Sequence, residues 1–548
     1  MKIILLPKRF QIYKETLMNQ IIKFRKSFYI KINIFIFAIL FILNNSLAQN
    51  QTNIWIIGNY YGIDFNYNRF SPFERVPFDS VNLLKTSSSI CDENTGKLLF
   101  YSDGFNVYDK NFQVMPNGRE MLAGRGFGQT CLIVPDPANA KRYYLFTTRS
   151  YEDTIKYTKE GMKPVASGLY YSIVDMHLNG GLGDVVSQEK NILLLTKSTA
   201  TLTAVQQDNG LGFWLITHEW QSNRFAIFNV TNNGIDKPFY QAIGHYYKDL
   251  DTYQGTIQVS PDRSKLAIII NTNFNVLGMS KKTLPLEVYD FDSKSGTLSN
   301  PQVLGNFSNG ASTIFSPDNG KLYVSYYGVD EEQYPPLTQF DLTKKNTIEI
   351  INSKKSIYWN FKPFKSAPGE ILPTPTAMLQ LAPDGKLYNG VRGIVRKDPN
   401  FVDVVLFRLD HPNKSAHLTE PGFVKLFKKP LTDFINYSVE ITFPNFMQHH
   451  FHNLESREFI IAEECRLIDL IALPNPTIDK VKLKLESDRE ECFFPVTVEV
   501  FNVLGQKIQV NHWQTGTVEV DLSSLAPATY IFKIKYANNY QAIKVIKY

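Results

Sequence analysis

A short motif that recurs along the chain constrains its fold more than any other feature of the sequence. Three clear copies, VSPDRSKLAIII, FSPDNGKLYVS and LAPDGKLYNG, occupy residues 259–270, 315–325 and 381–390. Each copy is an apolar run, a Pro-Asp turn with Gly or Ser, and then Lys-Leu before a second apolar run. Proline presets the backbone for a turn, aspartate caps it and glycine tolerates a positive φ, so each copy predicts a β-hairpin.

Weaker copies extend the repeat over residues 52–447. The aspartates of the six turns recur at intervals averaging about 58 residues: Asp92, Asp136, Asp208, Asp262, Asp318 and Asp384. The runs between them are rich in β-branched and aromatic residues and lack helical periodicity, which predicts an all-β fold. Four-stranded units of this size are typical of β-propeller blades, and the spacing favours seven blades, with six or eight left open.

The two ends of this region suggest how the ring closes. The runs IWIIG and GIDF near residues 54–65 are too short to form a blade alone, and VEITFPNF (residues 439–446) is a further strand-like run at the other end. Joining first and last strands in one blade would remove exposed sheet edges. We therefore expect residues 439–446 to complete the blade that the first strands begin.

The same region resembles the secreted WD40-like or YVTN-like β-propeller proteins of bacteria that use type IX secretion. The matching runs include GNYYGIDF, GKLLFYSDG, LIVPDP, YSIVDMHLNGGLGDV, WLITHEW, FSPDNGKLYVS, LAPDGKLY and FPNF. The resemblance implies a propeller and an exported protein. It implies no activity, because the family carries no catalytic motif that can be transferred to this chain.

The first 48 residues have the order of a secretory signal peptide. A basic stretch (KFRKSFYIK, residues 23–31) precedes an apolar run (IFIFAILFIL, residues 34–43) and then Ser-Leu-Ala, which predicts cleavage between Ala48 and Gln49. The apolar run is shorter than the roughly 20 residues of a membrane-spanning helix, so a retained anchor is the less favoured alternative. Met18 is a second candidate start.

Loss of this leader changes the charge of the protein. The chain carries a formal net charge of +6 at pH 7. Residues 1–48 contribute eight Lys or Arg and one Glu, so the remainder is close to −1. The basic balance therefore belongs to the leader, and we expect no nucleic-acid partner.

The C-terminal segment, residues 473–548, resembles a type IX secretion C-terminal sorting domain, which is a small β-sandwich. The motif residues that the resemblance carries over are Pro474, Asn475, Pro476, Gly505, Tyr530 and Lys547. Alternating runs such as VTVEVFNV and VEVDL independently predict strands with one buried face. We expect a linker at residues 448–472 and contact of this domain with the type IX secretion machinery. A terminal sandwich without a sorting role is the alternative.

Four cysteines remain for disulfides, which an exported protein can form. Four cysteines allow three pairings, and sequence alone does not choose among them. We favour Cys91 with Cys131 and Cys465 with Cys492, because each pair lies within one expected region.

Two histidine-containing runs could carry chemistry. MQHHFHN (residues 447–453) brings His449, His450 and His452 together, but no carboxylate or cysteine stands at ligand spacing, so a solvated linker is favoured over a metal site. His218 and Glu219 would point to opposite faces of a strand, which favours blade packing over acid–base catalysis. The sequence predicts no catalytic residue, no metal site and no cofactor.

These observations favour a secreted or cell-surface binding or adhesion module whose ligand is an extracellular polysaccharide or protein. The site is expected on the concave central face of the propeller. One alternative is a secreted glycan or peptide hydrolase with its active site in the propeller channel. A structural component of the surface layer is another. Carboxylates gathered from several blades would escape sequence motifs, so the hydrolase stays open at this stage.

Overall fold

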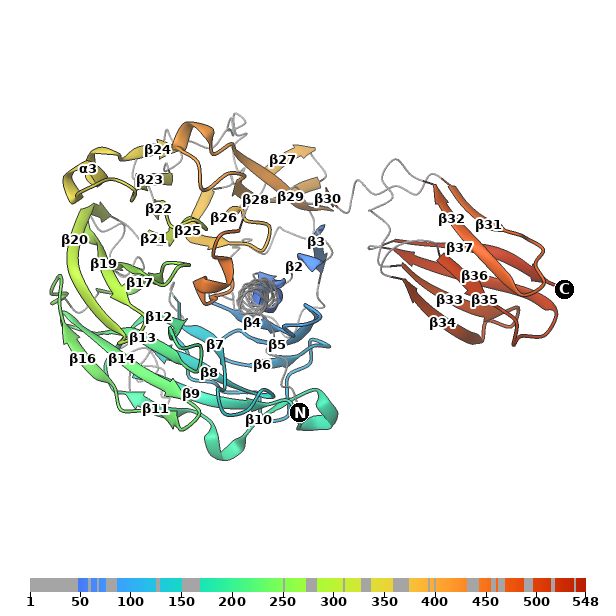
Figure 1. Cartoon of the computed structure of the whole chain (residues 1–548), viewed down its shortest axis with the longest axis horizontal. Coiled ribbons are helices and arrows are strands. Elements are labelled where there is room, and N and C mark those ends of the chain that lie inside the picture. Colours follow the sequence, from blue (N-terminus) through green and yellow to red (C-terminus); the bar gives the residue numbers. More distant parts are fainter. Residues whose placement is uncertain are drawn as a thin grey trace, which may run out of the picture.

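The computed structural model divides the chain into a ring of β-sheets and a separate C-terminal β-sandwich (Figure 1). Residues 1–47, and with them nearly all of the expected signal peptide, lie outside the described part. The structure describes residues 48–57, 61–66, 69–74, 86–124, 129–149, 168–249, 252–272, 283–308, 311–326, 337–357, 374–392, 395–398, 401–430, 443–454, 460–461, 469–486, 496–513, 518–536 and 539–548.

Seven sheets surround a common centre in the described residues and form a β-propeller (Figure 1). The first three blades comprise β1 (Ile54–Ile57), β2 (Tyr61–Asp64), β3 (Arg69–Glu74) and β30 (Ile460–Ile461); β4 (Ser88–Cys91), β5 (Leu98–Ser102) and β6 (Val107–Asp109); and β7 (Cys131–Pro135), β8 (Arg142–Arg149), β9 (Gly168–Asp175), β10 (Asp184–Val185) and β11 (Ile192–Leu195).

The next two blades are β12 (Ser198–Gln206), β13 (Phe213–Glu219), β14 (Arg224–Thr231), β15 (Gly234–Ile235) and β16 (Phe239–Ala242); and β17 (Thr252–Val259), β18 (Lys265–Thr272), β19 (Thr283–Asp292) and β20 (Thr297–Ser308). Blade six comprises β21 (Ala311–Phe315), β22 (Lys321–Tyr326), β23 (Leu337–Asp341), α3 (Thr347–Asn352) and β24 (Lys355–Ile357). Blade seven comprises β25 (Thr374–Leu381), β26 (Leu387–Arg392), β27 (Val395–Asp398), β28 (Phe401–Leu409) and β29 (Pro421–Pro430). The all-β class and the seven units that the repeat predicts are confirmed.

The repeat motif forms the turn between the two innermost strands of a blade. In blade five, the Ser260 hydroxyl donates to Asp262 at 2.6 Å and accepts from the Lys265 amide at 2.9 Å, while Arg263 takes a positive φ of 66°. Ser316, Asp318 and Lys321 repeat these bonds in blade six. Side-chain oxygens thus satisfy the turn amides that cannot join the strand ladder.

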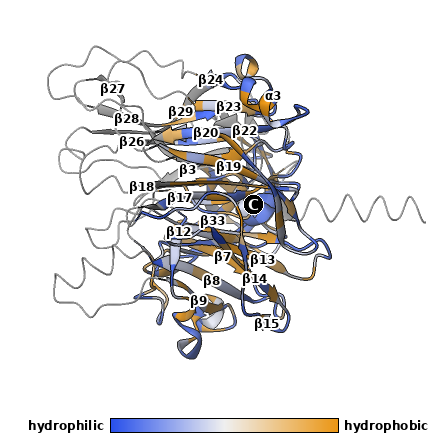
Figure 2. Ribbon diagram, turned by 90° about the vertical axis from the view of Figure 1, so that its left-hand side faces the viewer, coloured by the Kyte–Doolittle hydropathy of each residue, from blue (hydrophilic) through white to orange (hydrophobic). Residues whose placement is uncertain are grey.

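The lysine of the motif has a second role in each of the three clear copies. Its ammonium pairs with an aspartate at the end of the third strand, at 2.9 Å for Lys265–Asp290, 3.0 Å for Lys321–Asp341 and 3.2 Å for Lys386–Asp410. The pair therefore joins the second and third strands at one edge of the blade. Figure 2 shows hydrophobic residues concentrated along strands such as β7, β13 and β19, where neighbouring blades pack.

Among the described residues, the first blade is completed by a segment other than residues 443–446. Of residues 439–446, only 443–446 are described, and they form no strand of the first blade: Pro444 makes a single parallel bridge to Ser87, beside β4. The strand that joins the first blade is β30, which pairs parallel to β3 through Arg69–Ile460 and Phe70–Ile461. Two elements of the expected linker, η7 (Gln448–Phe451) and β30, thus belong to the propeller.

The C-terminal unit is a sandwich of two antiparallel sheets. One contains β31 (Asp469–Leu473), β32 (Lys480–Glu486) and β35 (Val518–Asp521); the other contains β33 (Val496–Asn502), β34 (Lys507–Trp513), β36 (Ala528–Tyr536) and β37 (Asn539–Lys547). Along β33 the side chains of Val496, Val498 and Val500 are fully buried and alternate with more exposed residues. This is the alternation expected from a sheet with one face in the core.

The two cysteines of the propeller do not form the expected disulfide. Cys91 and Cys131 are buried free thiols. They lie on the inner strands of adjacent blades, β4 and β7, and face different neighbours: Cys91 the backbone of residues 53 and 54, Cys131 the Ser102 hydroxyl and the Gly104 backbone. Burial raises the pKa of both thiols, to about 12 for Cys131. Cys465 and Cys492 lie outside the described residues.

Among the residues that the structure describes, no helix has the length and hydrophobicity needed to cross a membrane.

Candidate functional site

Where the structure describes the axis of the propeller, it is lined largely by neutral polar side chains and contains little free space. The cavity there measures about 10 Å³, which is room for about one ordered water. Its lining comes from the inner strands and from the segment that follows blade seven: Thr86, Gln129, Thr256, Gln258, Ser312, Met378, Leu379, Gln380, Phe443, Pro444 and Asn445. No carboxylate or histidine is among the described residues of this lining.

Asn445 fills the axis with its own hydrogen bonds. Its side-chain Nδ2 donates to the backbone oxygens of Cys131 at 3.2 Å and Leu202 at 3.0 Å, and its backbone oxygen accepts from the Ser88 hydroxyl at 3.0 Å. These partners belong to three consecutive blades. One asparagine therefore satisfies inner-strand carbonyls that no neighbouring strand reaches.

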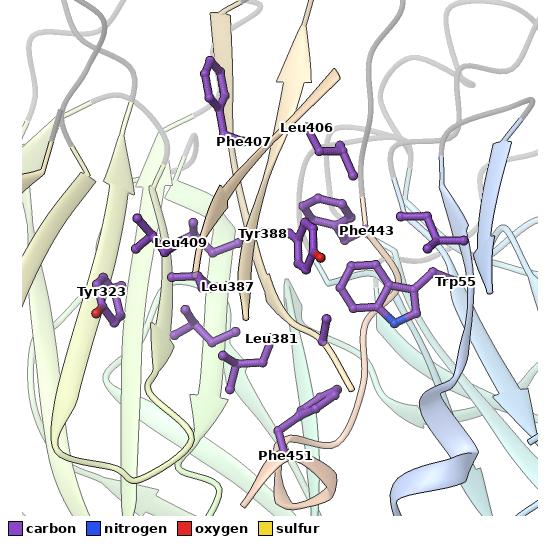
Figure 3. Close-up of a cluster of buried hydrophobic side chains, with 14 of the residues drawn as sticks. Trp55, Tyr323, Leu381, Leu387, Tyr388, Leu406, Phe407, Leu409, Phe443 and Phe451 are labelled. Atoms are coloured by element: carbon purple, nitrogen blue, oxygen red, sulfur yellow. The ribbon is translucent and has the colours of Figure 1, made fainter. Parts of the chain in front are cut away.

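Gln129 extends the same network to another blade. Its Nε2 donates to Asn445 Oδ1 at 3.2 Å, and its Oε1 accepts from the backbone amide of Ile257 at 2.8 Å. We call residues 443–454 the axial segment. In Figure 3 its Phe443 lies beside Trp55 and Tyr388, and its Phe451 lies further along the same cluster. Among the described residues, the protein's own axial segment thus fills the centre of the ring.

The histidine cluster is part of this axial segment and not of a solvated linker. His450 is 5% exposed, and its ring lies 4.4 Å from that of His449. Burial, the neighbouring His450 and Arg263 lower the pKa of His449 well below its ordinary value of 6.5. Across the described residues, no three His, Cys, Asp or Glu side chains are grouped as they would be around a metal ion.

His218 and Glu219 diverge, as the strand geometry predicts. His218 is buried between the rings of Phe225 and Tyr247, at 5.0 and 5.3 Å, and burial lowers its pKa to about 3. Glu219 instead forms an ion pair with Arg224. His218 therefore serves ring packing, while the largely buried Glu219 serves an ion pair.

A buried carboxyl that no sequence signal indicates lies between blades four and five. Glu287 is 2% exposed, accepts from the Tyr247 hydroxyl at 3.2 Å and from the His245 amide at 2.9 Å, and has its pKa raised by burial. Gly244 makes this approach feasible: its φ is +81°, and a Cβ there would lie 1.8 Å from the Tyr289 hydroxyl. The group is sealed from solvent and joins two blades.

A groove of about 770 Å³ lies between blades six and seven and is open to solvent. It is formed by β23, β24 and the turn preceding α3 on one side, and by η5 (Ala416–Leu418) and the start of β29 on the other. Its lining consists of Gln339, Asp341, Lys344, Ser353, Lys355, Ser356, Ile357, Ser415, Ala416, His417 and Pro421. We call this the inter-blade groove. No motif points to it, because each wall comes from a different repeat.

A buried hydrogen-bond chain holds the two walls together. Gln339 Nε2 donates to the Tyr323 hydroxyl at 2.7 Å and to the Lys414 backbone oxygen at 2.9 Å. Tyr323 in turn donates to the Pro412 backbone oxygen at 2.6 Å. These hydrogen bonds hold the connection between β28 and β29 of blade seven against blade six, so the groove is preformed.

Three motif residues of the C-terminal sandwich, Asn475, Tyr530 and Lys547, have side-chain hydrogen-bond partners. Asn475 bonds to the backbone of β37, donating to Lys544 O at 2.7 Å and accepting from Ile546 N at 2.9 Å. Gly505 takes a φ of 79° in the β33–β34 turn, and the Tyr530 hydroxyl donates to Ala526 O at 2.7 Å. Pro474 and Pro476 flank Asn475 and follow cis peptide bonds.

Lys547 is the most constrained of these residues. It is 7% exposed, and its ammonium donates to the backbone oxygens of Leu522 at 2.7 Å, Ser523 at 3.2 Å and Leu525 at 2.7 Å. A buried charge needs such partners to offset its lost hydration. The penultimate residue of the chain therefore fixes the loop after β35.

The fold and these partners define an exported β-propeller with a C-terminal sorting domain. Residues 472–548 match the family model described as "Secretion system C-terminal sorting domain". The chain is therefore handled by the type IX secretion machinery and directed to the cell surface or secreted. No curated protein matches the sequence.

Solved structures with similar architecture include PorZ, a surface component of the type IX secretion system of Porphyromonas gingivalis (11% identity, 91% of this chain and 69% of that one, TM-score 0.33). Others are a quinonprotein alcohol dehydrogenase-like protein from Bacteroides thetaiotaomicron (10%, 72% and 79%, 0.35) and an oligogalacturonate lyase from Vibrio parahaemolyticus (12%, 55% and 67%, 0.29). At these identities and TM-scores, none of the similarities extends to an activity or a site.

Proposed function

We propose that the exported propeller is a binding or adhesion module that takes an extracellular polysaccharide or protein. The observation that carries this proposal is the occupied axis together with the open inter-blade groove. The described axis lining offers neutral amides and hydroxyls packed against Asn445, whereas a hydrolase needs acid, base or nucleophilic groups that converge on accessible space. The groove offers accessible polar groups in a volume typical of ligand sites.

The route to the surface forms part of the same proposal. Signal peptidase is expected to cut between Ala48 and Gln49, and the motif residues of the sorting domain are expected to preserve the shape that the secretion machinery recognises. N-terminal sequencing of the exported chain tests the first step: the proposal requires Gln49 as the first residue. An exported chain that retains residues 1–48 would contradict it.

The binding role is tested with the exported chain purified from producing cells. The chain is applied to a glycan array and to extracellular-matrix proteins, and in parallel to generic glycosidase, lyase and peptidase substrates. Saturable binding without turnover is the expected result. Turnover of any of these substrates would replace the binding module by the hydrolase, and absence of both binding and turnover would leave a structural surface component.

A further inference from the structure

We propose that the inter-blade groove binds an acidic polysaccharide, one that bears carboxylate or sulfate groups, with Lys344 and Lys355 as the anion-binding residues. This inference rests on the proposed binding function and adds the place of the site and the chemical class of its ligand. The ligand would lie along the groove between β24 of blade six and η5 of blade seven.

The inter-blade groove carries more positive than negative charge among its described residues. Its described lining residues include two lysines and a single carboxylate, that of Asp341. Asp341 is already satisfied, because Lys321 Nζ lies 3.0 Å and the Thr343 hydroxyl 2.6 Å from it. Burial opposes ionisation of Asp341, but these hydrogen bonds prevail and leave its pKa below the ordinary value. The groove therefore presents uncompensated positive charge.

The two lysines are free to meet a ligand. Lys344 is 46% exposed and lies 3.7 Å from the far oxygen of Asp341, which is a long contact for an ion pair. Lys355 is exposed on β24, directly opposite Gln339 of β23, and within the described part of the chain no carboxylate pairs with it. Neither ammonium must break a strong bond before binding an anion.

The remaining lining suits a sugar chain. The hydroxyls of Ser356 and Ser415 have no hydrogen-bond partner among the described residues, so both remain free to exchange bonds with sugar hydroxyls. Ala416 and Pro421 provide apolar surface for the C–H faces of a sugar ring. The groove is far larger than a single inorganic anion needs. Among its described lining residues there is no Phe, Tyr or Trp on which a nucleobase could stack, and His417 has the one aromatic ring.

The test compares the exported parent chain with the Lys344→Ala/Lys355→Ala double variant and with Lys355→Glu. The probes are polygalacturonate, dextran sulfate and neutral dextran, and binding is measured by calorimetry at low and high salt. The matched control is Lys294→Ala, because Lys294 is an exposed lysine in the equivalent turn of blade five. Thermal unfolding confirms that each variant is folded, as expected from the exposure of both lysines.

We expect the parent to bind at least one acidic polymer and to bind neutral dextran more weakly. The double variant and Lys355→Glu should lose at least tenfold in affinity, while Lys294→Ala should bind as the parent does. Added salt should weaken parental binding, since the attraction is electrostatic. Preference for polygalacturonate over dextran sulfate would identify carboxylate as the recognised group, and the reverse would identify sulfate.

Two outcomes separate the inference from the function it rests on. If the variants bind an acidic polymer as tightly as the parent, or if the parent binds only a neutral glycan or a protein, the groove assignment is overturned and the binding module stands. If the parent binds nothing on the array, none of the matrix proteins and none of these polymers, both are overturned.

Discussion

The side-chain amide of Gln129 donates to Oδ1 of Asn445 at 3.2 Å, and so joins two residues 316 positions apart at the centre of the ring. Gln129 stands just before the inner strand of blade three, and Asn445 belongs to the segment that follows blade seven. This bond and the hydrogen bonds of Asn445 to Cys131 and Leu202 attach the C-terminal end of the propeller to blades three and four, which come earlier in the chain.

Asn445→Ala should destabilise the propeller. The change removes the donor to two buried carbonyl oxygens and the acceptor for Gln129, and a buried group left unpaired costs about 1–3 kcal/mol. We expect a loss of roughly 3 kcal/mol, measured by urea unfolding of the exported chain. Asn445→Asp should lose more, because a carboxylate would face the oxygens of Cys131 and Leu202.

The control for Asn445 is Asn232→Ala, which changes an exposed asparagine in the β14–β15 turn. Its unfolding midpoint should match that of the parent. Equal midpoints for Asn445→Ala and Asn232→Ala would show that the axial hydrogen bonds add nothing to stability.

His218→Phe should reduce the acid sensitivity of the protein. Burial holds the pKa of His218 near 3 in the folded state, against an ordinary 6.5, so the unfolded chain takes up this proton first as the pH falls. The histidine therefore lowers the free energy of unfolding as the pH falls below about 6.5, by roughly 3 kcal/mol at pH 4. Phenylalanine retains the ring contacts and cannot be protonated.

The measurement is the difference in unfolding free energy between parent and His218→Phe at pH 7 and at pH 4. On acidification, the free energy of unfolding of the variant should rise by a few kcal/mol relative to that of the parent. A difference that does not change with pH would mean that His218 is already protonated, or hydrated, in the native protein.

Asp384→Asn should have the opposite pH signature. Burial raises the pKa of Asp384 from 3.8 to about 6 despite hydrogen bonds from Tyr388 and the Lys386 amide. The unfolded chain therefore releases this proton before the folded one, and Asp384 withdraws stability as the pH rises from about 4 to about 6. Between pH 4 and pH 6, the free energy of unfolding of the variant should rise by roughly 3 kcal/mol relative to that of the parent, as measured by denaturant titration. A constant offset between the two would contradict this assignment.

Lys547→Ala should loosen the sorting domain. The variant leaves the carbonyl groups of Leu522 and Leu525 without their buried donor, and bonds to charged groups contribute about 1.5–3 kcal/mol each. We expect faster proteolysis of residues 472–548 and less exported protein. Lys544→Ala, an exposed lysine on the same strand, is the control and should behave as the parent. Unchanged proteolysis of Lys547→Ala would show that the ammonium is dispensable for the fold.

Cys91 and Cys131 should resist thiol reagents in the native protein and react after denaturation without any reductant. Both are buried, and their raised pKa values leave little thiolate, the reactive form. Differential alkylation followed by peptide mapping measures this directly. A peptide in which Cys91 is cross-linked to Cys131 would contradict the structure.

The repeat could be interpreted from sequence because its chemistry is local. The turn bonds of Ser260 and Asp262 connect residues a few positions apart, so Pro, Asp, Gly and Lys in order already predict them. The prediction of a Cys91–Cys131 disulfide was wrong because the contacts of a cysteine are not local. Cys91 and Cys131 are close in sequence, but each faces neighbours in other strands, and the spacing of two cysteines says nothing about that direction.

The axial segment and the inter-blade groove escaped prediction because both arise from the ring as a whole. The run FPNF has the composition of a strand, yet the space left at the axis determines its conformation, and no periodicity records that space. Lys344 and His417 come from different blades, so only the closed ring brings them to one groove.

The hydrogen bonds of Asn445 at the axis also determine that closure of the ring is the last step of folding. Ser88 meets Asn445 across 357 positions, whereas neighbouring inner strands meet across 57, as in the bond from Thr313 to Thr256. Loop-closure entropy makes the longer contact costlier by roughly 1.6 kcal/mol, so blades can dock pairwise well before the circle is complete. A chain interrupted before residue 443 would keep its blades but remain an open arc, with unpaired edges available to other chains. Intact delivery of the final fifth of the polypeptide, residues 443–548, thus separates a closed propeller from an aggregation-prone one.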